Sequence, residues 1–392
     1  MKHRFAKIIL SIFLCLTLFL GLPLVGFANE YQFDGGNGNS DGDIYSDLYD
    51  GIVGDGAESS IPDGAKQFVY DFSLSPENPL SFENIFSADG LAKIFEKIKD
   101  YMLSPLKTAA LLMTAILICA IIAGFKNEQE PTVNGAFKSF STVVCTAIII
   151  SPIVLLCTDC AEVLNALSVF MNALIPIYSG LLVTAAKMGT ALGFQTAVFI
   201  ATQCVSYIGT YIVSPFSSMF LALSISAGVS GEGRLASIAE MIKKTAMWTM
   251  SIAMTVYMAV FSIKNVITTS ADSAGARTAR FLISSFVPIV GVSINEALSS
   301  MKGCLDILTR SVSIYAVIIM VAIVLPLLAR LIFWRFVLSI CSCVSDIFCT
   351  DTISVLLRSI SAAVMILSAV VICSAIMFIF SITVLSHAAV SV

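Results

Sequence analysis

Long uncharged apolar runs alternate with short polar segments from about residue 108 to the end of the chain. Each run covers roughly 15 to 27 residues, and about 20 apolar residues are needed to cross the hydrocarbon of a bilayer. The pattern therefore predicts seven or eight transmembrane helices, since the run 215–229 is short enough to re-enter instead of crossing. The expected spans are 108–125, 140–157, 165–186, 190–213, 215–229, 246–263, 312–330 and 360–386.

The first 28 residues have the three-part layout of a secretory signal peptide. Lys2, Arg4 and Lys7 precede an uncharged apolar run at 8–20, and small residues follow near a cleavage site. A run of this length is too short to span comfortably. We expect cleavage after Ala28, which leaves Asn29 as the new terminus. An uncleaved anchor is the alternative, and both readings place the next segment outside the cytoplasm.

Residues 29–90 are expected to form an extracytoplasmic tether that is largely disordered. Between Asn29 and Ala65 there are nine acidic residues, no Lys or Arg, and many glycines. Such a segment buries too little apolar surface to offset the chain entropy lost on folding. The acids do not have the spacing of an EF-hand calcium loop, so calcium binding is the weaker alternative.

Two further segments are not long enough to span. The pattern at 91–102 predicts an interfacial helix, with Leu91, Ile94 and Phe95 on its apolar face. The apolar stretch 281–291 is interrupted by Pro288 and Gly291, and this pattern favours a re-entrant or interfacial segment.

A polar stripe follows on the predicted helix after Gly291. Leu298, Met301 and Leu305 belong to an apolar stripe at helical spacing. The polar stripe comprises Asn295, Ser299, Lys302, Asp306 and Arg310. It is a candidate face for lining a channel or binding a partner protein. A helix that lies on the outer membrane surface is the equal alternative.

Composition supports an all-α polytopic membrane protein with its multi-span body at 91–392. Hydrophobic residues make up 57% of the 392 residues and charged residues 12%, about half the share in a typical soluble domain. Too little polar surface remains for a soluble enzyme. The net charge of −4 argues against nucleic acid as a partner.

The distribution of basic residues gives a provisional topology under the positive-inside rule. With the tether outside, Lys126, Lys187 and Arg330 fall on the cytoplasmic side. The segment Thr158–Glu162 then forms an exterior turn between two spans. The weak point is 264–310, which carries several basic residues and would lie outside.

Few residues suited to catalysis or metal binding are present. Histidine occurs only at His3 and His387, and no hydrolase, nucleotide-binding or zinc-protease motif occurs. We therefore expect no enzymatic activity, no cofactor and no metal. Cys157 and Cys160 form a C-x-x-C pair, which could serve a redox role but is more simply two packing residues.

One long motif resembles the signature of the stage III sporulation protein AE family. It runs from Arg277 through Arg280 and Pro288 to Gly291 as RTARFLISSFVPIVG. Met171–Pro176 and the following Leu181-Leu182 are similar to an earlier helix pair of that family. The resemblance covers about residues 100–386.

The resemblance implies a role that composition does not show. Members of this family act in the mother-cell membrane around the engulfed forespore, in a channel that supports late forespore gene expression. The expected partners are other stage III sporulation membrane proteins, including a secretion-type ATPase and an intermembrane ring protein, and a membrane insertase. The family has no established catalytic residues. A stand-alone secondary transporter is the alternative, and a redox enzyme would rest only on the C-x-x-C pair.

Overall fold

The computed structural model describes residues 105–122, 131–185, 187–207, 233–286, 291–348 and 350–390, together with the single positions 222 and 226. The chain divides into two units, Met1–Leu48 and Tyr49–Val392, and every described residue belongs to the second. The signal peptide with Ala28 and Asn29, the tether 29–90, the helix predicted at 91–102, and Pro288 lie outside the described residues. The predicted span 215–229 lies outside them too, except for positions 222 and 226.

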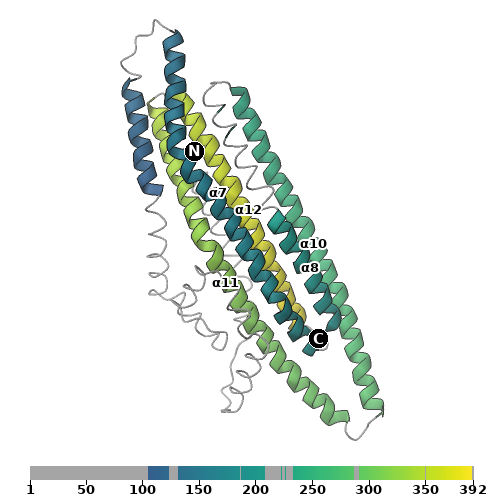
Figure 1. Cartoon of the computed structure of the whole chain (residues 1–392). Helices are drawn as coiled ribbons and strands as arrows, with labels where there is room; N and C mark the ends of the chain where they lie inside the picture. The colour runs from purple at the N-terminus through teal and green to yellow at the C-terminus, as the bar shows by residue number, and fades with distance from the viewer. Residues whose placement is uncertain are drawn as a thin grey trace. The chain divides into compact units, whose positions relative to one another are not determined.

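All the described elements are helices, which confirms the predicted all-α class for this part of the chain. A helix at Pro105–Ile122 precedes five labelled helices (Figure 1). These are α7 (Pro131–Thr184), α8 (Met188–Tyr207), α10 (Gly233–Phe286), α11 (Gly291–Ile347) and α12 (Asp351–Val390). Six of the described helices contain a stretch long and apolar enough to cross a membrane. The described residues thus support a multi-pass membrane protein.

The two spans predicted at 140–157 and 165–186 are parts of a single helix, so the exterior turn at Thr158–Glu162 is wrong. Helix α7 runs through this segment without interruption. Asp159 also pairs with Arg330 of α11, and the two residues therefore cannot lie on opposite sides of a bilayer. The charged residues at 158–162 suggested a turn, but the ion pair and the packing of α7 on α11 keep the segment helical.

Contacts between the helices fix their relative directions. Antiparallel packing of α7 and α11 brings Asp159 to Arg330 and Tyr178 to Ser313. Asn172 accepts a hydrogen bond from Thr202, so α8 returns along α7. Figure 1 shows α7, α11 and α12 running side by side, and α10 beside α8. The five labelled helices therefore alternate in direction along the chain.

The core lies where α7, α11 and α12 meet. Trp334, Tyr178, Phe170 and Phe378 are the largest fully buried side chains. Buried hydroxyl groups are mostly satisfied within their own helix, as where Ser168 donates to the carbonyl of Leu164. This bond lets small polar residues occupy an apolar bundle without an unpaired group.

Helix α10 is the least covered of the long helices. Only 6% of its most apolar part is buried, compared with 61% for the most apolar parts of α11 and α12. Trp248, Val256 and Ile263 are among its exposed large side chains. This helix lies at the edge of the bundle, and its contacts with α8 and α12 decide where it sits.

Candidate functional site

The polar stripe predicted after Gly291 lies on the first part of α11, which confirms that this segment is helical. The side chains of Asn295, Ser299 and Lys302 are outside the described ones. Asp306 and Arg310 are half-buried, while Leu305 and Leu308 of the apolar stripe are buried. The role of the stripe as a channel or partner face remains a prediction.

The family motif occupies the connection between α10 and α11. Residues 277–286 form the last turns of α10, and α11 begins at Gly291. Arg277 is exposed. The apolar stretch predicted to be re-entrant or interfacial is thus helical up to Phe286, and the motif joins two long helices that run in opposite directions.

Asp272 of α10 binds the beginning of α8 through three hydrogen bonds. The backbone N–H groups of Gly189 and Thr190 donate to its carboxylate over 2.9 and 2.6 Å. The hydroxyl group of Thr190 donates to the same carboxylate over 2.6 Å. The first N–H groups of a helix have no partner within it, and a carboxylate at this end is favoured by the helix dipole. We call this contact the Asp272 cap.

Two glycines allow α8 to approach α10 closely at the Asp272 cap. A Cβ atom added to Gly189 would lie 2.7 Å from the Asp272 carboxylate, and one added to Gly193 would lie 3.0 Å from Thr268. These glycines form the G-x-x-x-G pair of the sequence, a spacing that lets helix backbones come together in membranes. The helix that α8 approaches through these glycines is α10.

A small cavity lies next to the Asp272 cap. Its volume is about 10 Å³, which is close to the minimum that holds one water molecule. Thr190, Lys264, Asn265 and Thr268 contribute its polar lining, and Leu385 of α12 contributes to the apolar side. A few polar groups of α8 and α10 therefore lie at an otherwise apolar junction of α8, α10 and α12.

A second charged contact lies in the middle of α7 and α11. The guanidinium group of Arg330 donates to the carboxylate of Asp159, and both side chains are about three-quarters buried. Cys160, the next residue along α7, is fully buried, and Cys157 is half-buried. Both thiols are free, so they form no disulfide with each other in this structure.

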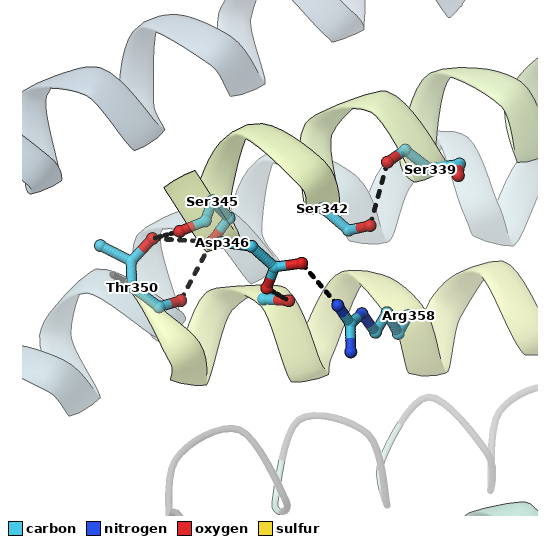
Figure 2. A network of polar contacts seen from close by, with 7 residues as sticks. Ser339, Ser342, Ser345, Asp346, Thr350 and Arg358 are labelled. Atoms are coloured by element: carbon cyan, nitrogen blue, oxygen red, sulfur yellow. Dashed lines mark hydrogen bonds and ion pairs between the residues drawn. The ribbon is translucent and has the colours of Figure 1, made fainter. Parts of the chain in front are cut away.

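A third polar network closes the tight turn between α11 and α12. Figure 2 shows Arg358 of α12 reaching Asp346 near the end of α11, and Ser354 donates to the same carboxylate. Thr350 precedes α12, and its hydroxyl group donates to the carbonyl of Ser345 over 2.9 Å. Side-chain bonds of this kind satisfy groups left open at helix ends. The network fixes the angle at which α12 leaves α11.

These three contacts hold helices together, and each uses charged or hydroxyl groups that satisfy one another. No group of three or more His, Cys, Asp or Glu side chains that could hold a metal occurs among the described residues. Neither Asp272 nor the Asp159–Arg330 pair was predicted from the sequence pattern. An acid inside the apolar stretch Met247–Thr278 was the available signal, because such residues usually have a specific partner.

Comparison with known proteins extends the resemblance seen in the sequence. The family model for stage III sporulation protein AE matches residues 84–389. The chain is also similar to stage III sporulation protein AE of Bacillus subtilis (strain 168), with 21% identity over 356 residues, which is 88% of this chain and 84% of that protein. No solved structure matches the chain. Because the family model covers most of its length, including the bundle and the motif between α10 and α11, the chain belongs to the stage III sporulation protein AE family.

Proposed function

We propose that this chain is a non-enzymatic membrane subunit of the channel between the mother cell and the engulfed forespore. The observation that carries the proposal is the family match over 84–389, which implies a role in sporulation. The long apolar helices of this same region support a place in the membrane. In this proposal the protein lies in the mother-cell membrane around the forespore and supports late forespore gene expression.

The contacts between the helices support a structural role for the bundle. The carboxylates of Asp159, Asp272 and Asp346 each bind a group on another helix. Hydrogen bonds and ion pairs between helices fix the positions of the helices. We propose that the bundle presents surfaces to the other channel proteins, which we expect to include a secretion-type ATPase and an intermembrane ring protein. A membrane insertase would assist its assembly.

Deletion of the gene in its native host tests this role. Engulfment should be completed, but a reporter that is transcribed late in the forespore should stay silent, and heat-resistant spores should fall by orders of magnitude. The wild-type gene supplied in the mother cell should restore both, whereas expression only in the forespore should not. Normal late transcription in the deletion strain would contradict the proposal. If the reporter also stays silent without the secretion-type ATPase, the result favours the channel over a transporter that works alone.

The polar stripe on α11 gives a more local prediction. Three charges on one face of a helix need water, lipid headgroups or a protein partner, because each costs about 2.5–3.5 kcal/mol in hydrocarbon. If the stripe binds a channel protein, Lys302→Glu should impair spore formation without lowering the amount of protein. A helix resting on headgroups should tolerate the change at a cost near 1 kcal/mol.

A photo-reactive amino acid at Gly303 provides a second readout for the stripe. Gly303 is exposed, and a Cβ atom added to it would meet open space, so the substitution should not disturb the helix. It should cross-link to a tagged ring protein or ATPase in sporulating cells, and Lys302→Glu should weaken the product. The same probe at Val256, an exposed residue of α10, is the control. Normal sporulation in the Lys302→Glu strain with no cross-link from position 303 would favour the surface helix.

A further inference from the structure

The apolar parts of the longest helices exceed the thickness of one bilayer. The apolar stretch of α7, Ser139–Thr184, has 46 residues, and that of α11, Leu305–Ile347, has 43. At 1.5 Å per residue these are about 69 and 65 Å long, while the hydrocarbon of a bilayer is about 30 Å thick. A single bilayer can therefore surround only part of each helix.

Charged residues divide the bundle into two layers. On α10 the uncharged segment 245–263 lies between Lys244 and Lys264, and on α11 the uncharged segment 311–329 lies between Arg310 and Arg330. Each segment has about 19 residues and is about 28 Å long. Both lengths agree with the thickness of the hydrocarbon.

The contacts place these two segments at the same level. At one end, Tyr178 of α7 binds Ser313, which is one turn from Arg310. Asp272 lies two helical turns beyond Lys264 on α10. Its carboxylate binds the beginning of α8, which follows closely after the end of α7. At the other end Arg330 pairs with Asp159. The same boundaries leave residues 163–184 of α7 uncharged.

We infer that the layer of the bundle between the Asp159–Arg330 pair and the level of Lys264 and Arg310 is the part that the hydrocarbon of a single bilayer surrounds. We call it the lipid layer. Exposed apolar side chains occur on several of its helices and include Val169, Phe199, Val256 and Val260. Its partner is lipid, and the charges at both ends lie at the headgroups, where basic side chains are favoured.

The other half of the bundle lies beyond the Asp159–Arg330 pair. It contains the Asp346–Arg358 ion pair, whose side chains are 39% and 59% exposed. Charges exposed at this level would be costly inside hydrocarbon, so this half is the poorer candidate for the lipid layer. It also carries exposed apolar side chains, such as Leu111, Phe140 and Val143. The exposed ion pair, and not these apolar side chains, decides which half is assigned to the hydrocarbon.

The inference requires that α7 remain straight in the membrane, and spin-label distances test this. A ketone-bearing amino acid at Val143 and Val169, both exposed, allows labelling without changing the native cysteines. In liposomes containing the full chain, the labels should be about 39 Å apart along a straight helix. If α7 folded at Asp159 so that both halves crossed one bilayer, the distance should be below about 20 Å. The pair Ile307 and Ile332 of α11 is the control, because it should give about 38 Å in both arrangements.

Fluorescent labels at the same positions test the position of the bilayer. Brominated acyl chains should quench a label at Val169 and one at Val256 strongly, and should leave a label at Val143 almost unquenched. Strong quenching at Val143, or a short distance between positions 143 and 169, would overturn the inference. Neither result depends on the channel role, which the forespore reporter tests separately.

Discussion

Asp272→Ala should destabilise the bundle and reduce sporulation, because it leaves the beginning of α8 without its acceptor. Two backbone N–H groups and the hydroxyl group of Thr190 lose their partner at once. Each buried donor left unpaired costs about 1–3 kcal/mol, and partial access to water at this end lowers that figure. We expect a loss of about 2–3 kcal/mol for the whole change, measured as apparent unfolding free energy in detergent. Asp272→Asn should lose less, since its amide oxygen still accepts.

Ser270→Ala is the matched control for the Asp272 change. Ser270 lies on the same helix and is exposed, and its hydroxyl group binds only the carbonyl of Val266 in its own helix. Its removal should leave stability within about 0.5 kcal/mol of the wild type. A drop as large as that of Asp272→Ala would show that α10 is sensitive to any change and would contradict a special role for the Asp272 cap.

A double-mutant cycle with Gly189 makes the test sharper. Gly189→Ala should destabilise the wild-type chain, because its new Cβ meets the Asp272 carboxylate at 2.7 Å. In the Asp272→Ala background that carboxylate is absent, so the same change should cost far less. Gly275→Ala meets open space on the same helix as Asp272 and should be neutral or slightly stabilising, since Ala favours a helix over Gly by about 1 kcal/mol. Additive effects of Gly189→Ala and Asp272→Ala would contradict the proposed contact.

The helical class of the protein was predictable from sequence, but the continuity of its helices was not. Apolar runs of bilayer length identify the helices because the hydrocarbon demands such runs. The charged residues at 158–162 interrupt the apolar sequence of α7, and this local pattern predicts a turn there. Arg330 lies on a different helix, 171 residues away along the chain, so no local pattern shows that Asp159 has a partner.

The candidate contacts show the same limit. The Gly189–Gly193 spacing is typical of a close helix approach, which the structure shows, but the spacing does not select α10 as the partner. Asp272 is recognisable as an acid in an apolar stretch, and its binding to the N-terminus of α8 follows only from the antiparallel packing of α8 and α10. Local patterns identify groups that require a partner, and tertiary packing decides which partner they bind.

The Asp159–Arg330 pair gives the second prediction with a large expected effect. Arg330→Ala should destabilise the protein, because it leaves the Asp159 carboxylate without its counter-charge in the middle of an apolar helix. Breaking a fully buried pair costs about 3–5 kcal/mol. The two side chains retain 23% and 30% exposure, so we expect about 1–3 kcal/mol here.

Neutral substitutions at both positions should recover most of the stability lost on removing Arg330. The double change Asp159→Asn with Arg330→Gln removes both charges and keeps hydrogen-bonding groups at both positions, so no uncompensated charge is left between the helices. Arg358→Ala is the control, because this arginine also pairs with an acid but is 59% exposed, and exposed pairs contribute about 0–1 kcal/mol. Thermal unfolding of the three variants and of the wild type in detergent measures the effects. If Arg330→Ala costs no more than Arg358→Ala, the pair does not stabilise the middle of the bundle, and the boundary it provides for the lipid layer loses its support.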